Sequence, residues 1–263
     1  MLKLLGIPFD ANSSFLKGPS YAPDRIRLMD KEGSANRFAE NGIEVIPGET
    51  YADLGDLSFE STDPKKAFEL IRTRVFKEIS SGERLLSIGG DHSVSFPIID
   101  AHSEVHKGLN ILHFDAHADL YENFDNNPFS HASPFARLME TGRINSLTQV
   151  GLRTLSTHQR DQANRYGVKI IEMKDLNEAF LHQLKGPLYI SLDLDVLDPA
   201  FAPGVSHHEP GGMSTRELIS FIQKVPLRVI GADLVEYNPM RDTNSMTAMV
   251  GYKLMKELMV KML

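Results

Sequence analysis

Cysteine is absent from this 263-residue sequence, which excludes a disulfide framework, a thiolate zinc site and a cysteine nucleophile. Long apolar runs are absent too, because none approaches the roughly 20 residues that a membrane-spanning helix needs. Residues 1–10 carry one lysine and a short apolar run, so they resemble a first strand more than a signal or transit peptide. These absences predict a cytoplasmic protein with no membrane partner.

Positive charge is also in short supply. The formal net charge is −7, with 28 Lys and Arg against 35 Asp and Glu. Nucleic-acid binding would require a basic face, so this balance predicts no nucleic-acid partner, and it permits a small cationic substrate. A chain of this length buries roughly three quarters of its unfolded surface, so it needs neither a disulfide nor a structural metal to be stable.

What the sequence does contain is an alternation of short apolar runs with longer helical patterns. This alternation is typical of a three-layer α/β fold, in which helices cover both faces of a doubly wound, mostly parallel sheet. No internal repeat or Gly/Ser linker interrupts it, so we expect a single domain over residues 1–263. The predicted strands are residues 2–8, 43–46, 84–88, 109–114, 148–151, 168–171, 188–192 and 228–232. The predicted helices are residues 22–29, 64–80, 96–106, 134–141, 157–166, 215–224 and 246–262.

The run Asp115-Ala116-His117-Ala118-Asp119 directly follows the apolar residues 109–114. Metal-ligand side chains occur in it at every second position. Residues two apart on an extended chain point to the same side, so these three side chains can converge at the end of a strand. The alternative interpretation is a polar loop with a helix cap, and the strict alternation after an apolar strand favours the ligand cluster.

Two further strand ends carry similar residues. Asp193 and Asp195 close the apolar residues 188–192 with the same spacing, and His92 follows two glycines after residues 84–88. Glycine at such a position leaves the backbone free to turn sharply. His92 taken alone would more often be a core or loop histidine, so its assignment depends on the other two strand ends.

Together, these strand ends supply four carboxylates and two imidazoles. Crowded carboxylates repel and raise one another's pKa values unless cations neutralise them, and two divalent ions balance four negative ligands. An oxygen-rich set with only two imidazoles favours manganese over zinc. We therefore predict two Mn²⁺ per chain as cofactors, and a hydroxide shared between them as the nucleophile. The predicted metal ligands are His92, Asp115, His117, Asp119, Asp193 and Asp195.

In order and spacing, the three motifs resemble those of the ureohydrolase family, which contains arginases and agmatinases. They are Gly89-Gly90-Asp91-His92, Asp115-Ala116-His117-Ala118-Asp119 and Ser191-Leu192-Asp193-Leu194-Asp195-Val196-Leu197-Asp198-Pro199. The resemblance extends over most of the chain, and it is closest to plant-type arginases in residues 130–137, 201–212, 231–233 and 236–239. It implies an arginase-like fold and an enzyme that hydrolyses a guanidino compound to urea and an amine.

The resemblance also divides the ligands between two metal ions. One site would contain His92, Asp115, Asp119 and Asp193, while His117 and Asp195 would complete the second, with some carboxylates bridging.

Roles outside the metal sites follow from the resemblance as well. His131 would be the catalytic histidine that protonates the leaving amine, although by itself it would be taken for a surface-loop histidine. Glu236 would pair with the substrate guanidinium, which suits a planar bidentate contact, although by itself it would be taken for a helix cap or surface charge. Asp233 would support a metal ligand by a hydrogen bond.

The metal ligands do not specify the rest of the substrate. Tyr121 and Glu122, in the loop of residues 120–125, would read its far end. His207 and His208 either contact that end too or are loop histidines without this role. Similarity to plant-type arginases favours arginine, which would give ornithine and urea. Agmatine, which would give putrescine and urea, and other guanidino acids are the alternatives, because Glu122 would repel an α-carboxylate if it faced the pocket.

Two other classes of function are weaker alternatives. A non-catalytic metal-binding homologue could dispense with ligands, but all six and His131 are present. Another metal-dependent amide hydrolase need not have this histidine and aspartate set. Members of the family are commonly trimers or hexamers, so the resemblance also implies a homo-oligomer.

Overall fold

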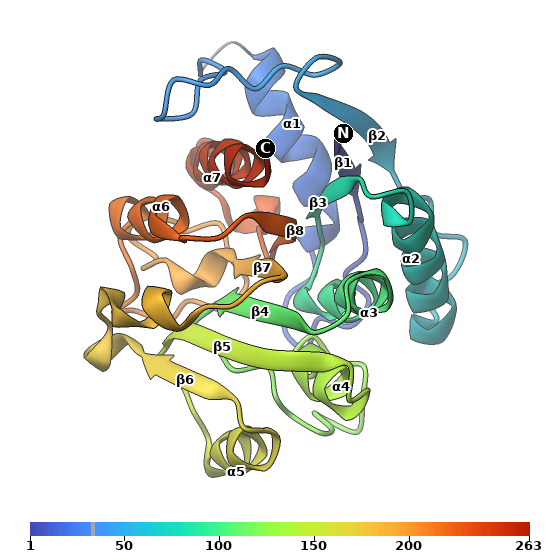
Figure 1. The fold of residues 1–263 in the computed structure, drawn as a ribbon, viewed down its shortest axis with the longest axis vertical. Coiled ribbons are helices and arrows are strands. Elements are labelled where there is room, and N and C mark those ends of the chain that lie inside the picture. The colour runs from blue at the N-terminus through green and yellow to red at the C-terminus, as the bar shows by residue number, and fades with distance from the viewer. Residues whose placement is uncertain (33–34) are drawn as a thin grey trace.

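The computed structural model describes residues 1–32 and 35–263. These residues form one sheet of eight strands in the order β2-β1-β3-β8-β7-β4-β5-β6, and each neighbouring pair is parallel (Figure 1). Every residue of β4 and β7 is buried, as expected for central strands that are covered on both faces. The strands are β1 Leu2–Gly6, β2 Tyr51–Asp56, β3 Arg84–Ile88, β4 Leu109–Phe114, β5 Ile144–Leu152, β6 Lys169–Glu172, β7 Leu188–Asp193 and β8 Val229–Val235.

Helices cover both faces of the sheet, which confirms the predicted three-layer α/β fold (Figure 1). Buried side chains of α1, α6 and α7 form the core on one face, and those of α2, α3, α4 and α5 form the core on the other. The α-helices are α1 Ala22–Lys31, α2 Pro64–Ile79, α3 Ser95–Val105, α4 Pro134–Glu140, α5 Thr157–Tyr166, α6 Thr215–Lys224 and α7 Met246–Met262. The 3₁₀ turns are η1 Pro19–Tyr21, η2 His92–Val94, η3 Met173–Asp175, η4 Glu178–Gln183, η5 Leu194–Val196 and η6 Pro239–Arg241.

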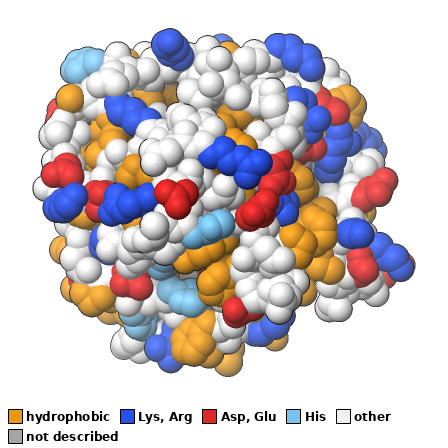
Figure 2. Space-filling view, turned by 90° about the horizontal axis from the view of Figure 1, so that it is seen from below, with side chains coloured by type: hydrophobic (Ala, Val, Ile, Leu, Met, Phe, Trp, Pro, Cys, Tyr) orange, Lys and Arg blue, Asp and Glu red, His pale blue; other side chains and the backbone are white. Residues whose placement is uncertain are grey.

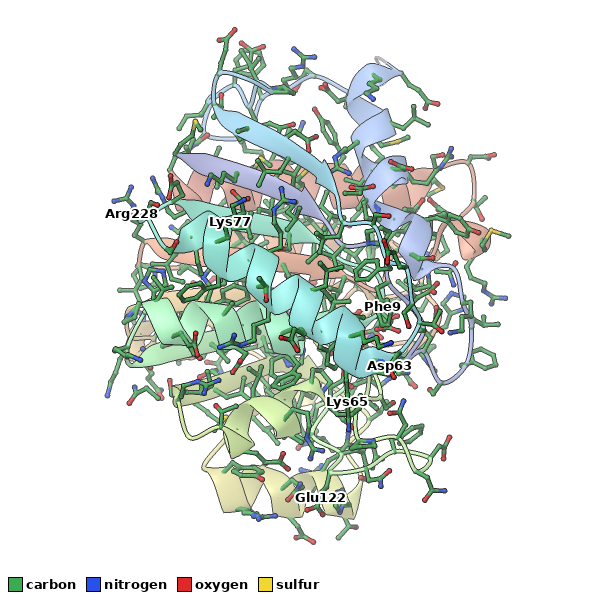
Figure 3. The ribbon with its side chains drawn as sticks, turned by 90° about the vertical axis from the view of Figure 1, so that its right-hand side faces the viewer. Phe9, Asp63, Lys65, Lys77, Glu122 and Arg228 are labelled. Carbon is green, nitrogen blue, oxygen red and sulfur yellow. The ribbon has the colours of Figure 1, made fainter. Side chains whose placement is uncertain are left out.

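Side-chain caps explain where two of these helices begin. The Ser214 hydroxyl accepts from the Glu217 backbone, and the Glu217 carboxylate accepts in return, so a capping box starts α6. Asp63 accepts from the Lys66 backbone at the start of α2. From Asp63, on the side of the molecule where Phe9 lies, α2 runs to Lys77 on the opposite side (Figure 3). The helix thus runs antiparallel to the strands and begins at their carboxyl edge.

One predicted strand is wrong. Residues 43–46 form only an isolated antiparallel bridge between Phe38 and Glu44, and the second strand of the sheet is Tyr51–Asp56. This strand lies at the edge of the sheet and pairs only with β1. Because one side and part of its surface face solvent, its sequence includes two aspartates and a glycine instead of a continuous apolar run. An apolar pattern could not find it.

The surface in the view of Figure 2 mixes basic and acidic side chains, with apolar side chains between them. That face has no broad patch of a single charge among the residues that are drawn in colour. Within residues 1–32 and 35–263, no helix combines the length and the apolar character that crossing a membrane requires.

Candidate metal centre

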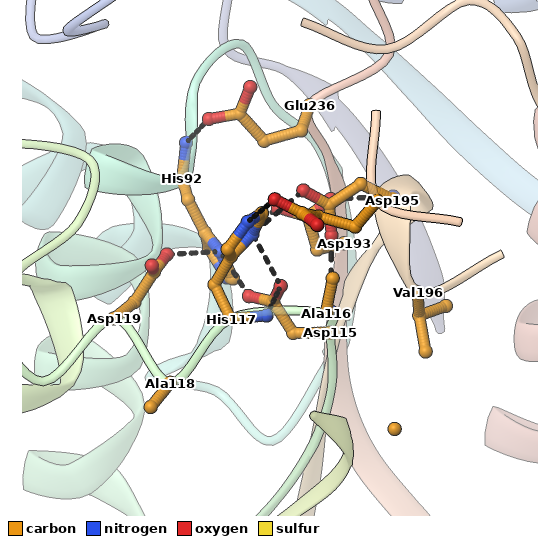
Figure 4. Close-up of polar contacts among 12 residues, drawn as sticks. His92, Asp115, Ala116, His117, Ala118, Asp119, Asp193, Asp195, Val196 and Glu236 are labelled. Carbon is orange, nitrogen blue, oxygen red and sulfur yellow. Dashed lines mark hydrogen bonds and ion pairs between the residues drawn. The ribbon is translucent and has the colours of Figure 1, made fainter. Parts of the chain in front are cut away.

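Three neighbouring parts of the sheet bring the six predicted ligand side chains together (Figure 4). His92 begins η2 just after β3, the motif of residues 115–119 follows β4, and Asp193 and Asp195 lie where β7 passes into η5. The strands β3, β8, β7 and β4 are neighbours in this order, and each pair is parallel. Their carboxyl ends therefore lie side by side in the middle of one edge of the sheet. Residues 115–119 bend after β4, and Asp195 lies in η5, so the turns that follow the two strands bring the side chains towards one another.

The first ligand set surrounds the imidazole of His92. Its Nδ1 lies 3.2 Å from Asp115 Oδ2, 3.0 Å from Asp119 Oδ2 and 3.2 Å from Asp193 Oδ2. All four side chains are buried. Within the described chain, His92 Nδ1 is a buried atom without a hydrogen-bond partner, and three carboxylate oxygens converge around it.

The second set surrounds the imidazole of His117. Its Nδ1 lies 3.0 Å from Asp195 Oδ2 and 3.4 Å from Asp115 Oδ1. Asp115 therefore faces both imidazoles, with Oδ2 towards His92 and Oδ1 towards His117. A carboxylate in this position can serve two cations at once.

The electrostatics of the cluster favour cations. Burial, together with the charges of Asp195 and Asp115, raises the pKa of Asp193 well above its usual range. Burial alone would lower the pKa of His92, but its contacts with Asp115, Asp119 and Asp193 outweigh burial and raise it. The negative charge of neighbouring carboxylates contributes to both shifts, and a divalent ion would neutralise it. A set of carboxylate oxygens with two imidazole nitrogens fits manganese-like ions, and the residues present therefore fit the predicted group.

His131 and Glu236 form a second buried pair beside this cluster. His131 Nδ1 lies 2.8 Å from Glu236 Oε1, and the same oxygen accepts the His92 backbone N–H at 2.8 Å. Burial alone would lower the pKa of His131, but the Glu236 carboxylate raises it to about 9. His131 is thus protonated at neutral pH, and it can donate a proton.

Two acidic residues of the site have an unusual backbone conformation. Asp119 has φ 48° and Glu236 has φ 64°, in the left-handed region that favours glycine. Such a conformation costs on the order of 1–3 kcal/mol for a residue with a side chain, and it persists only where the surroundings impose it. At Glu236 the surroundings are evident, because its N–H donates to Gly90 O at 2.9 Å. This strain marks Asp119 and Glu236 as functional candidates.

Asp233 lies where it can support His92. Its Oδ1 accepts from the Ser191 hydroxyl at 2.7 Å, and that hydroxyl lies 3.2 Å from His92 Nε2. Its Oδ2 accepts from the Tyr189 hydroxyl at 2.9 Å. The connection to His92 therefore runs through Ser191 and is not direct.

A pocket of about 270 Å³ opens onto the cluster. Tyr121 and His207 both line it, and the His207 ring centroid lies 5.9 Å from that of His117 and 5.3 Å from that of His131. The full lining is Ser14, His117, Asp119, Tyr121, Phe124, His131, Ala132, Thr154, Gln159, Asp193, Asp195, His207 and Glu236.

The structure does not bring Glu122 or His208 to this pocket. Glu122 is exposed, and its nearest cation is Arg165, at 4.0 Å; Figure 3 places it beside α5. His208 is exposed too, and its Nε2 lies 2.7 Å from Pro203 O. The predicted contact of these two residues with the substrate therefore has no support in the geometry. Loop side chains follow no fixed period, so their direction could not be read from the sequence.

Ser14 is a site residue that the sequence did not reveal. Its hydroxyl lies 2.8 Å from His131 Nε2, on the side of the ring opposite Glu236. A hydrogen bond to the protein interior fixes the loop that carries Ser14, because Asn12 N–H donates to buried Asp91 Oδ2 at 3.0 Å. Ser14 belongs to no spaced motif, and only the fold brings it to His131.

Gly90 stands at a bend after β3, as the sequence predicted, and it is required for close approach as well. Its φ is not positive, but a Cβ there would lie 1.9 Å from Phe9 O. We expect Gly90→Ala to lower the free energy of unfolding by about 1–3 kcal/mol or more, because backbone atoms must move. Urea unfolding of the metal-free protein measures this. Gly251→Ala is the control, because its Cβ would meet side-chain atoms and no backbone, Ile26 at 3.1 Å and Leu194 at 3.8 Å. Equal stability of both variants would contradict the explanation.

Comparisons with known proteins agree over nearly the whole chain. The model of the Arginase family matches residues 2–261. The chain is 44% identical to "Arginase 1, mitochondrial" of Arabidopsis thaliana, over 98% of this chain and 80% of that protein. It is 30% identical to "Agmatinase" of Bacillus anthracis, over 98% and 90% respectively. The solved structure "Arginase from Medicago truncatula" superposes with a TM-score of 0.94, at 42% identity, over 99% of this chain and 87% of that one. The Arabidopsis protein is named mitochondrial, so the cytoplasmic location stays a prediction.

Proposed function

The chain belongs to the arginase family, and from this premise we propose that it hydrolyses arginine to ornithine and urea, using two Mn²⁺ ions. It is a hydrolase that acts on the C–N bond of an amidine group. The observation that carries the proposal is the convergence of the carboxylates on His92 and His117, in the same pocket as the pair of His131 and Glu236.

Each metal ion would be held by one of the two ligand sets, with Asp115 shared between them. When bound, the ions would lower the pKa of a water molecule so that hydroxide is available at neutral pH. Asp193 and Asp119 would complete the set around His92, and Asp195 the set around His117.

The remaining chemistry falls to Glu236 and His131. The buried Glu236 carboxylate lines the pocket, where it can bind and orient a planar guanidinium. Hydroxide adds to the guanidinium carbon, and the bond from that carbon to the alkyl-bearing nitrogen breaks. Protonated His131 gives its proton to this nitrogen, so that the amine leaves neutral. The hydroxyl group that was added loses its proton to solvent, which leaves neutral urea.

Arginine is favoured because the structure removes the main objection to it. Repulsion of an α-carboxylate would require Glu122 to face the pocket, and Glu122 lies outside it, near Arg165. Agmatine is the second candidate, because the described residues that line the pocket include no lysine or arginine to pair with an α-carboxylate. Neutral side chains such as Tyr121, Phe124 and Gln159 line the pocket instead.

The test is urea release from arginine, agmatine and guanidinobutyrate by the manganese-loaded protein, side by side, with Asp119→Ala as the inactive control. We expect the highest kcat/KM with arginine. A preference for agmatine would keep the mechanism and overturn the choice of substrate. If no guanidino compound were hydrolysed although manganese was bound, the proposed function would fail.

Ser14→Ala is expected to lower kcat about fivefold and to leave the manganese content unchanged. The hydroxyl accepts from Nε2–H of protonated His131 in a partly buried contact, and a hydrogen bond of this kind contributes about 1 kcal/mol. Steady-state urea release and metal analysis of the same samples measure both quantities. Ser58→Ala, the same change at an exposed position outside the pocket, serves as the control. An unchanged kcat in the Ser14 variant would show that this hydroxyl does not assist His131.

A further inference from the structure

His113 and Gln149 contact the motif of residues 115–119 and belong to neither ligand set. They are register partners on the adjacent strands β4 and β5, and both side chains are fully buried. His113 Nε2 lies 2.8 Å from Asp115 Oδ2, and His113 Nδ1 lies 3.0 Å from Gln149 Nε2. The two ring nitrogens of His113 thus face two different partners. The nitrogen that carries the hydrogen determines to which of them His113 donates.

The protein backbone fixes that proton. Gln149 Nε2 also donates to the Ala118 carbonyl oxygen at 2.6 Å. The opposite amide orientation would place an oxygen against that carbonyl, so Gln149 must present N–H groups to both Ala118 and His113. An N–H that points at His113 Nδ1 requires a lone pair there. His113 is therefore a neutral ring with its hydrogen on Nε2, which donates to Asp115.

This orientation of the Gln149 amide is the favoured one, although it leaves one buried atom without a hydrogen bond. Among the described residues, Gln149 Oε1 is a buried atom without a hydrogen-bond partner. Reversing the amide would relieve that atom only by bringing two acceptors, Oε1 and Ala118 O, together at 2.6 Å. The observed arrangement is the less costly one, because a missing hydrogen bond costs less than a lost bond together with a direct repulsion.

We propose that His113 is a positioning residue for Asp115, and not a third metal-ligating histidine. Its nitrogens lie close enough to His92 and Asp115 for a metal cluster, but both are already committed, Nδ1 to Gln149 and Nε2–H to Asp115. The inference rests on the metal centre that is proposed above.

The consequence for Asp115 is a fixed orientation. Its Oδ1 accepts from the His117 backbone N–H at 2.7 Å, and its Oδ2 accepts from His113. One donor on each oxygen holds the carboxylate so that Oδ2 faces His92 and Oδ1 faces His117. Because Asp115 is shared, His113 acts on the affinity of both metal ions. Partners of this kind typically change metal affinity 10–100-fold.

The first experiment reads the proton directly in the metal-free protein. Long-range ¹H–¹⁵N spectra of the histidine rings, with His113→Phe to assign the signal, report which nitrogen carries hydrogen. We expect His113 to be protonated on Nε2 alone at pH 7.5. Hydrogen on Nδ1 would overturn the proposal, because Gln149 could then not donate to it.

The second experiment titrates manganese chloride into metal-free protein by calorimetry. We expect His113→Phe to bind two ions with about 10–100-fold lower affinity, and Gln149→Met to show a smaller loss, because His113 is retained but no longer held in one tautomer. Gln162→Met, a buried glutamine on α5, is the matched control. Unchanged affinity in both test variants overturns the proposal. Loss of one whole ion in His113→Phe would make His113 a ligand and overturn it too.

Neither experiment uses a guanidino substrate. A protein that binds manganese as described but does not hydrolyse arginine would therefore contradict the proposed function and leave the role of His113 standing. If His113→Phe does not fold, Gln149→Met and the wild-type spectrum of the metal-free protein, assigned by His113→Gln, still decide the question.

Discussion

Asp193→Asn is expected to lower kcat/KM by more than about a hundredfold, beyond the loss typical of residues that only support a ligand. Asp193 Oδ2 lies 3.2 Å from His92 Nδ1, in the set that would hold one ion. Its Oδ1 accepts the Asp195 backbone N–H at 2.8 Å. Asparagine keeps an oxygen for Asp195 but removes the negative charge that faces His92, so the fold is retained and the cation loses a ligand.

Although Asp193→Asn should lower activity, it should not lower the free energy of unfolding of the metal-free chain. Burial and the charges of Asp195 and Asp115 raise the pKa of Asp193 above its value in the unfolded chain. The folded state then binds more protons than the unfolded state, so stability falls as pH rises above about 4. Asparagine removes this penalty. Metal-free Asp193→Asn should equal or exceed the wild type in stability at pH 7.5, and the difference should vanish towards pH 4.

Urea unfolding with and without manganese separates the two effects. A ligand at 1,000 times its Kd stabilises a protein by about 4 kcal/mol per site, so the wild type should gain strongly from manganese, and the variant should gain less. Asp161→Asn, the same change at an exposed position of α5, is the control. If Asp193→Asn kept both its manganese-dependent stabilisation and its activity, Asp193 would not be a ligand.

The meeting of the ligand residues could be predicted because parallel strands end at a common edge. This rule is enough to place the motif of residues 115–119 near Asp193 and Asp195. The rule for an extended chain does not describe the motif itself, because residues 115–119 bend after β4 and Asp119 has φ 48°. His92 needed more, because it lies in a 3₁₀ turn after its strand, and only the agreement of three strand ends made it a candidate.

Other parts of the site were not predictable, because no local pattern encodes them. His113 lies within an apolar run, and its partner Gln149 is on a different strand, so its hydrogen bond depends on the register of β4 and β5. Ser14 reaches His131 from 117 positions away in the sequence. Tyr121 and His207 line the pocket whereas their neighbours Glu122 and His208 do not, because the directions of loop side chains are set by tertiary contacts.

His131→Asn should remove the proton donor and leave the metal centre intact. His131 Nδ1 is held by Glu236 and its Nε2 faces Ser14, so neither nitrogen is placed as a metal ligand. General acid catalysis contributes about 10²–10⁴-fold, and we expect kcat to fall by that factor while two manganese ions stay bound. Loss of manganese in this variant would contradict the assignment.

The pH dependence of the same variant tests the role of the proton. The Glu236 carboxylate raises the pKa of His131 to about 9, above the usual value near 6.5. The protonated donor is therefore present at neutral pH and is lost as pH rises through about 9, so wild-type kcat should fall there. Asparagine does not titrate, so the residual kcat of His131→Asn should lack this fall. His208→Asn, an exposed histidine outside the pocket, should keep both the wild-type kcat and its pH profile. If His131→Asn retained the fall near pH 9, another group would be the proton donor, because the titrating residue would still be present.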